Sequence, residues 1–364
     1  MKVIVYFGHH KVGSTALQAY LARNALALLE HGILYPAVES EGMSHLLAQA
    51  LGRQDRPALG CMNVREPHNA LAFRMLASKT GRKTPPWHGP LPGVAAMLNT
   101  LTHQVEVLQP RTVILCSEVF ANFGAGHEDL IAKLHGLFPA AEWELYCALR
   151  RPDEYMASWF GQRLRFGHQL EPLSSPGSGQ TGSIHFNYRR MVEPWVREFA
   201  GCPLHLRNYS DILAVGGSVQ DFTAQAGCTF PKGLPVKGPS NKGLPRAAYE
   251  IIRRANHDLP PEQAQALREF FLTAPGGLSP VRSSDVELFG AERRQQLADA
   301  FAPIHDYLST LTGRPAFFPG LEEMRSTRPV PEAEAAAQLL AKLDPATLPA
   351  PELSSFISSL QRKS

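Results

Sequence analysis

Four short apolar runs constrain the fold of this chain more than any other feature. Each is nearly continuous in aliphatic and aromatic residues, which is typical of parallel strands that are buried on both faces. Helical patterns of apolar spacing follow three of the four runs. A strand followed by a helix, repeated along the chain, predicts an α/β fold with a central, mainly parallel sheet flanked by helices. The runs are residues 3–8, 112–117, 143–149 and 204–208.

A long segment, residues 38–109, separates the first strand and helix from the second apolar run. Because idle loops of that length are uncommon, we expect a helical insertion with a function. Between residues 50 and 90 it carries seven basic and two acidic residues, which favours anionic or polyhydroxylated ligands. A solvated helical surface explains the same charges. The basic residues are Arg53, Arg56, Arg65, Arg74, Lys79, Arg82 and Lys83.

The remaining chain is predicted to be mainly helical after Pro245. We expect one domain over residues 1–325. Beyond it the composition shifts to Ala, Pro, Glu and Leu, which predicts a peripheral helical extension over residues 326–364.

Charge and composition narrow the class of protein. A net charge of +3 suits a site for an anionic ligand, but a dedicated nucleic-acid binder is usually more basic. No apolar run approaches the roughly 18–20 residues of a membrane span. The chain starts directly with a strand, so we expect no signal peptide. Five scattered cysteines without a C-x-x-C pair favour a reducing compartment, and we expect the cytoplasm.

The strongest local motif is GHHKVGST, residues 8–15, which joins the first strand to a helix. A glycine-containing turn into a helix start presents backbone N–H groups and a positive helix end, which together bind anions. A P-loop for ATP or GTP would have lysine where Ser14 stands, so Lys11 is the cation of this loop. The second run ends in Ser117-Glu118 rather than in a magnesium-binding aspartate, and we expect no metal.

The run HKVGSTALQ, residues 10–18, resembles the 5′-phosphosulfate-binding loop of the sulfotransferases that use 3′-phosphoadenosine 5′-phosphosulfate (PAPS). Bacterial members of that family often show the form H-K-x-G-[ST]-T-x-L-Q. The resemblance implies that Lys11, Gly13, Ser14 and Thr15 hold the 5′-phosphosulfate of PAPS.

A second stretch, LRRPDEYMAS, follows the third run and resembles the 3′-phosphate motif of the same family. The resemblance assigns Arg150 and Ser158 to the 3′-phosphate of PAPS. Arg151 stands where asparagine or aspartate is usual, so which arginine makes the contact stays open. Tyr209, after the fourth run, is a candidate for packing near the adenine, and a core tyrosine is the alternative.

The acceptor needs a general base, for which family members use histidine or glutamate. Glu118 is the first choice, because it follows the second strand on the expected rim, and partial burial should raise its pKa. A capping or ion-paired carboxylate is the alternative. His45, Glu41 and Glu39 in the insertion compete with it. His9 and His10 could also line the pocket, although His10 is expected to shape the loop.

The resemblance therefore implies a sulfotransferase that transfers a sulfuryl group from PAPS to a hydroxyl or amine, on a saccharide or glycan, and releases 3′,5′-ADP (PAP). We expect the insertion to bind the acceptor, while Lys11 neutralises charge on the leaving group. Two alternatives remain: a P-loop nucleotide-dependent kinase, and a nucleotide-binding homologue that no longer catalyses. The oligomeric state stays open.

Overall fold

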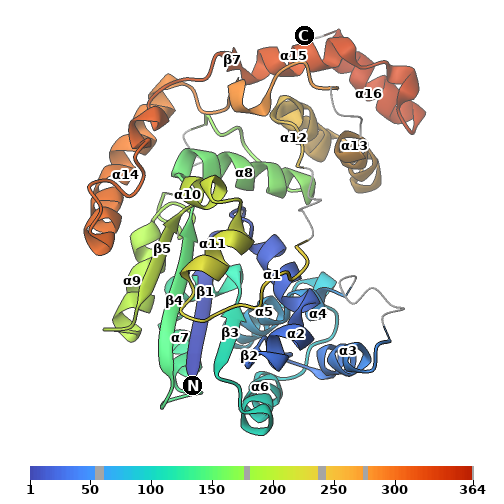
Figure 1. Ribbon diagram of the computed structural model, residues 1–364. Helices are drawn as coiled ribbons and strands as arrows, with labels where there is room; N and C mark the ends of the chain where they lie inside the picture. The colour runs from blue at the N-terminus through green and yellow to red at the C-terminus, as the bar shows by residue number, and fades with distance from the viewer. Residues whose placement is uncertain (54–60, 176–180, 237–242, 274–277, 363–364) are drawn as a thin grey trace. The chain divides into compact units, whose positions relative to one another are not determined.

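The computed structural model describes residues 1–364 except 54–60, 176–180, 237–242, 274–277 and 363–364. The chain divides into two compact units, each built from segments that are far apart in the sequence (Figure 1). The sheet unit comprises residues 1–150, 187–239 and 307–317, and the helical unit comprises residues 151–186, 240–306 and 318–364. The single domain over residues 1–325 stays a prediction.

The sheet unit contains a five-stranded sheet in which every neighbouring pair of strands is parallel. This confirms the predicted central parallel sheet and all four predicted strands. The additional strand, β2, is only two residues long and pairs with β3 at the edge. The order is β2-β3-β1-β4-β5. The strands are β1 (Lys2–Gly8), β2 (Ile33–Leu34), β3 (Thr112–Cys116), β4 (Glu142–Leu149) and β5 (Leu204–Asn208).

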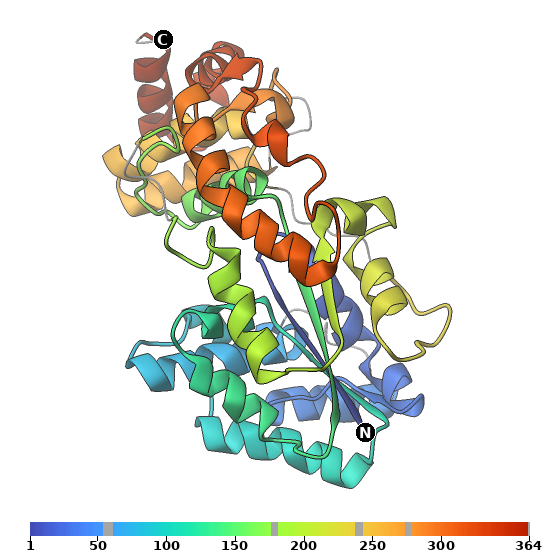
Figure 2. The same cartoon turned by 90° about the vertical axis from the view of Figure 1, so that its left-hand side faces the viewer.

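Helices cover both faces of this sheet (Figure 2). On one face, Tyr6 of β1 packs in a cluster with Leu17 of α1 (Ser14–Arg23) and Phe222 of α11 (Ser218–Gln225). On the other face, Phe7 stacks on Trp195 of α9 (Tyr188–Glu198), with ring centroids 4.5 Å apart. Consecutive residues of β1 thus bury their side chains on opposite faces, as the apolar run requires. The sheet unit also holds α2 (Ala25–Glu30), α7 (Glu128–His135) and α10 (Tyr209–Ala214).

The predicted insertion, residues 38–109, is largely helical where the structure describes it. Its helices are α3 (Ser40–Ala50), α4 (Met62–Arg65), α5 (Pro67–Thr80) and α6 (Val94–Leu108). Several of its basic side chains are solvent-facing, as a solvated helical surface requires: Arg82 and Lys83 are exposed, and Lys79 pairs with Asp129 at 2.8 Å. Arg56 lies outside the described residues.

The helical unit confirms the prediction that the chain is mainly helical after Pro245. Its helices are α8 (Pro152–Arg165), α12 (Tyr249–Asp258), α13 (Pro261–Thr273), most of α14 (Ala291–Thr312), α15 (Glu332–Lys342) and α16 (Pro351–Gln361). Two short strands, β6 (Val286–Glu287) and β7 (Val330–Pro331), pair in parallel. Within the described ranges, no helix is both long and apolar enough to cross a membrane.

Candidate active site

Four adjacent strands, β3, β1, β4 and β5, are parallel, so their carboxyl ends lie at the same edge of the sheet. Each is followed within three residues by a residue that the sequence singles out. These are Glu118 after β3, Lys11 after β1, Arg150 after β4 and Tyr209 after β5. Ligands of open parallel sheets bind outside this edge. The fold therefore places four predicted site residues along one rim.

The loop between β1 and α1 has an unusual backbone. Lys11 adopts φ 64° and Gly13 adopts φ 85°, both in the left-handed region. A Cβ on Gly13 would lie 2.7 Å from Oγ of Ser218, whose hydroxyl donates to the Gly13 carbonyl at 2.8 Å. Only glycine fits this position without moving α11. For Lys11, the same region is unfavourable, and such strain is typical of functional loops.

The start of α1 is suited to an anion. The N–H groups of Ala16 and Leu17 donate to the Gly13 carbonyl, while those of Ser14 and Thr15 have no acceptor within the helix. These N–H groups and the positive end of the helix dipole attract negative charge. The anion site that the sequence predicts at this helix start stays a prediction.

Arg150 joins this loop to the end of β5. Its Nη1 donates to the carbonyl of Lys11 at 3.4 Å, and its guanidinium lies 5.3 Å from the ring centroid of Tyr209. The hydroxyl of Tyr188 donates to the Arg150 carbonyl at 2.8 Å. Tyr209 is partly buried against the core cluster, so it combines the core role with contact to the predicted site. Lys11, Arg150 and Tyr209 are thus brought together.

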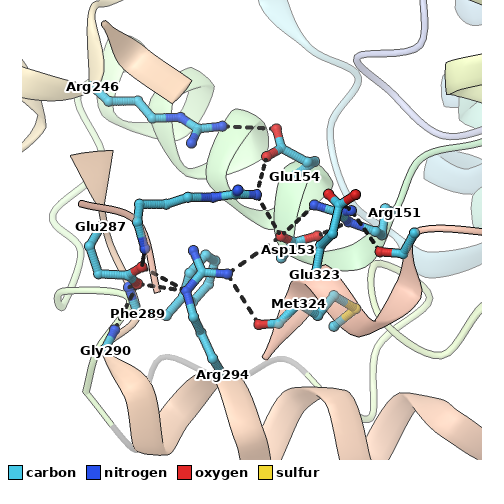
Figure 3. A network of polar contacts seen from close by, with 12 residues as sticks. Arg151, Asp153, Glu154, Arg246, Glu287, Phe289, Gly290, Arg294, Glu323 and Met324 are labelled. Atoms are coloured by element: carbon cyan, nitrogen blue, oxygen red, sulfur yellow. Dashed lines mark hydrogen bonds and ion pairs between the residues drawn. The ribbon is translucent and has the colours of Figure 1, made fainter. Parts of the chain in front are cut away.

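The structure separates Arg150 from its neighbour. Arg151 is engaged within the helical unit, where it donates to Asp153 at 2.8 Å and to Glu323 at 2.6 Å (Figure 3). It also donates to the carbonyl of Gly320. Arg150 is therefore the arginine at the sheet rim. Ser158 lies on α8 of the helical unit.

Glu118 lies in a buried polar network. Its carboxylate accepts from Gln18 Nε2 at 3.0 Å and from Asn69 Nδ2 at 3.3 Å, and it pairs with His10 Nδ1 at 3.6 Å. Asn69 also donates to Glu66 at 2.9 Å. The network links the loop after β1, the end of β3 and α5 of the insertion.

The pKa of Glu118 differs from the expected direction. Burial raises it, as predicted, but the hydrogen bond and positive charge of His10 outweigh burial, so the pKa lies below its usual value. The carboxylate therefore stays ionised. Glu66, by contrast, has a raised pKa, because it is buried and faces the charge of Glu118.

The competing bases lie in the insertion. His45 is on α3 and lines a small cavity with Tyr35 and Asn63. Glu39 caps α3, because its side chain accepts from the N–H groups of Glu41 and Gly42. Glu39 is thus occupied by a structural role, while the catalytic assignment of His45 stays a prediction.

Asn69 and Glu66 were missed by the sequence analysis. They precede Glu118 by about 50 residues, and nothing in their local sequence indicates that α5 brings them to the rim. Gln18 could have been identified from the sequence, because it is the last residue of the HKVGSTALQ motif.

No family model, no curated protein and no solved structure matches this chain.

Proposed function

We propose that this protein is a PAPS-dependent sulfotransferase that transfers a sulfuryl group to a hydroxyl or amine of a saccharide or glycan. The observation that supports it most is the junction of Arg150 with the loop of Lys11. A lysine inside the loop and an arginine from the next strand offer two cations beside a helix start. PAPS carries two separate anionic groups, which match this pair of cations.

In this proposal, Lys11, Gly13, Ser14 and Thr15 bind the 5′-phosphosulfate. The loop supplies backbone N–H groups, and the ammonium of Lys11 supplies positive charge. During transfer the acceptor oxygen bonds to sulfur, while the bond from sulfur to the bridging oxygen of the 5′-phosphate breaks. Lys11 stabilises the negative charge that develops on that bridging oxygen.

Arg150 is proposed to bind the 3′-phosphate, which does not react, and Tyr209 to contact the adenine, while the role of Ser158 stays what the family resemblance implies. A guanidinium gives a charge-assisted, multidentate contact to phosphate. The engagement of Arg151 with Asp153 leaves this role to Arg150.

We assign the removal of the proton from the acceptor to the pair of His10 and Glu118. His10 belongs to the loop, and its side chain is 19% exposed, whereas Glu118 is buried and ionised. We propose that His10 in its neutral form accepts the proton and that Glu118, whose carboxylate also accepts from Gln18 and Asn69, stabilises the resulting imidazolium. Direct acceptance by Glu118 and a base at His45 are the alternatives, and they predict different pH–rate profiles.

Ligand binding tests the proposal. PAP without added metal should raise the melting temperature, because a ligand at 100 times its dissociation constant adds about 2.7 kcal/mol of stability. ATP with Mg²⁺ should have little effect. If ATP with Mg²⁺ raises the melting temperature and PAP does not, the kinase alternative replaces the sulfotransferase. Turnover of labelled PAPS with an acceptor panel separates an enzyme from a homologue that only binds.

Arg150→Ala tests the site more locally. It should abolish most of the PAP-dependent shift, since a hydrogen bond to a charged group is worth about 1.5–3 kcal/mol. Lys83→Ala, an exposed cation of the insertion, is the matched control and should keep the full shift.

A further inference from the structure

The helical unit contains a pocket that the proposed PAPS site does not use. Its volume is about 290 Å³, near the lower end of the range for small-ligand sites. Residues of α8 form one wall at helical spacing, namely Tyr155, Trp159 and Arg163. Ser158 lies more than 90° from the middle of this wall around the helix, at 100° per residue. The pocket is therefore distinct from the proposed 3′-phosphate contact on the same helix.

Stacked rings form an aromatic surface in this pocket. His185 stacks on Trp159, with centroids 5.2 Å apart and planes 22° apart, and on Tyr155 at 5.8 Å and 14°. The hydroxyl of Tyr155 also contacts Nδ1 of His185 at 2.6 Å, which fixes the ring. Trp159 is only partly buried. Such a surface suits a ligand with a flat, weakly polar face, such as an aromatic or pyranose ring.

Arg163 supplies a positive charge to the lining of this pocket. Among the described residues, no carboxylate forms an ion pair with its guanidinium, although twelve other described arginines have such a partner. Partial burial lowers its pKa, which shows that it is incompletely hydrated. A half-buried guanidinium without a carboxylate favours an anionic group on the ligand, and a carboxylate matches it bidentately.

Two polar side chains complete the lining. Gln169 and Glu171 both line the pocket and are exposed. The Glu171 carboxylate can only accept hydrogen bonds, so it selects ligand hydroxyl donors. A ligand that satisfies both Arg163 and Glu171 must carry an anion and hydroxyl groups on one ring.

We propose that this pocket binds a pyranose carboxylate, that is, a uronic acid unit of a saccharide. The ring stacks on Trp159, the carboxylate pairs with Arg163, and a hydroxyl donates to Glu171. That this sugar belongs to the sulfate acceptor rests on the proposed function, whereas the binding itself does not.

A matched pair of ligands tests the carboxylate. Methyl β-D-glucuronide and methyl β-D-glucoside differ only in carboxylate against hydroxymethyl. The glucuronide should bind with a dissociation constant of about 1 mM, the affinity typical of a ligand of this size. The glucoside should bind about tenfold more weakly. Ligand-observed NMR titration of the full chain measures both.

Variants on α8 locate the effect. Arg163→Gln should remove the preference for the glucuronide and leave the glucoside unchanged, while Arg163→Lys should keep part of it. Arg165→Gln, an exposed arginine of the same helix, is the control and should bind both ligands as the native protein does. Trp159→Leu should weaken both ligands. A melting temperature close to that of the native protein shows that each variant is folded.

The outcomes separate the inference from the proposed function. Equal binding of the two methyl glycosides, or a preference that survives Arg163→Gln, overturns the inference even where PAP binds. Binding of 4-hydroxybenzoate in place of the glucuronide overturns the assignment to a sugar. A glucuronide preference that depends on Arg163 supports the pocket even if PAP fails to bind, in which case only the sulfotransferase proposal falls.

Discussion

Lys11 has a backbone conformation that lysine rarely adopts. At φ 64° this conformation costs of the order of 1 kcal/mol, which glycine does not incur. We therefore expect Lys11→Gly to leave the free energy of unfolding within about 1 kcal/mol of the native value, or to raise it. Turnover should fall by at least about 10²-fold, because the leaving-group charge loses its cation. Urea unfolding and labelled-PAPS assays measure the two effects. A glycine variant that is both less stable and fully active would contradict the role of Lys11.

Glu118 is ionised and acts through His10 in our proposal, so it is a positioning residue. Glu118→Gln removes the charge that stabilises a protonated imidazole. Turnover should fall by about 10²-fold or more, within the range for loss of acid–base catalysis. The acidic limb of the pH–rate profile should persist, because the proposed base, His10, is still present.

The other assignments give different profiles. If Glu118 is itself the base, its glutamine variant loses the acidic limb altogether. If His45 is the base, His45→Ala is inactive while Glu118→Gln retains most of its turnover. PAP affinity should stay within about twofold in each variant, which separates catalysis from binding.

Among the elements, the start of α8 is stabilised by a buried carboxylate that pairs with arginines. Asp153 is 3% exposed and pairs with Arg151 at 2.8 Å and Arg294 at 3.5 Å (Figure 3). Burial alone would raise the pKa of Asp153. The hydrogen bond and charge of Arg151 and the charge of Arg294 have the larger effect, so the pKa lies below its usual value. This carboxylate therefore stabilises the fold above the pKa of an unfolded aspartate, and the contribution is lost as the pH falls.

Asp153→Asn should destabilise the protein by about 3 kcal/mol at pH 7, because Arg151 and Arg294 lose the buried carboxylate that they share, although Arg151 keeps Glu323 and Arg294 keeps Glu287. Glu323→Gln is the matched control. Its carboxylate binds the same Arg151 but is 63% exposed, so the loss should stay below about 1 kcal/mol. Thermal unfolding measures both, and equal losses would show that burial does not set the strength of this pair.

The elements also show what the sequence can predict. The four long strands and the start of α8 at Pro152 were predictable, because apolar runs and a proline at a helix start are local signals. The turn after β1 was predictable because the motif GHHKVGST is also a local signal. The contact of Asn69 with Glu118 was not, because it depends on how α5 packs against the sheet. The lowered pKa of Glu118 follows from that packing and from His10.

At the scale of the whole molecule, the chain alternates between the two units along its sequence, and no local sequence pattern predicts this division. Helix α14 belongs to the helical unit up to Asp306 and to the sheet unit from Tyr307. The boundary predicted at residue 325 rests on composition and stays a prediction. Beyond it, α15 and α16 bury Leu339 and Ile357 in the helical unit.

The stability of the molecule should also depend on pH near neutrality, through Glu332 at the start of α15. Burial and the negative charge of Glu250 raise the pKa of Glu332 to about 7, which Arg253 only partly offsets. An unfolded glutamate titrates near 4.3. Between about pH 4.3 and 7 the folded protein therefore retains a proton that the unfolded chain has lost, so stability falls as the pH rises through this window.

Glu332→Gln should remove this dependence. At pH 8 the variant should exceed the native protein in stability by about 3–4 kcal/mol, since the pKa difference of about 2.7 units corresponds to about 1.4 kcal/mol per unit. At pH 4 the two should be alike. Glu334→Gln, an exposed residue of the same helix, should change stability by less than about 0.5 kcal/mol at either pH. Melting temperatures of the three proteins from pH 4 to 8 give the comparison. If the native protein and Glu332→Gln lose stability in parallel over that range, the carboxyl of Glu332 is not the source of the pH dependence.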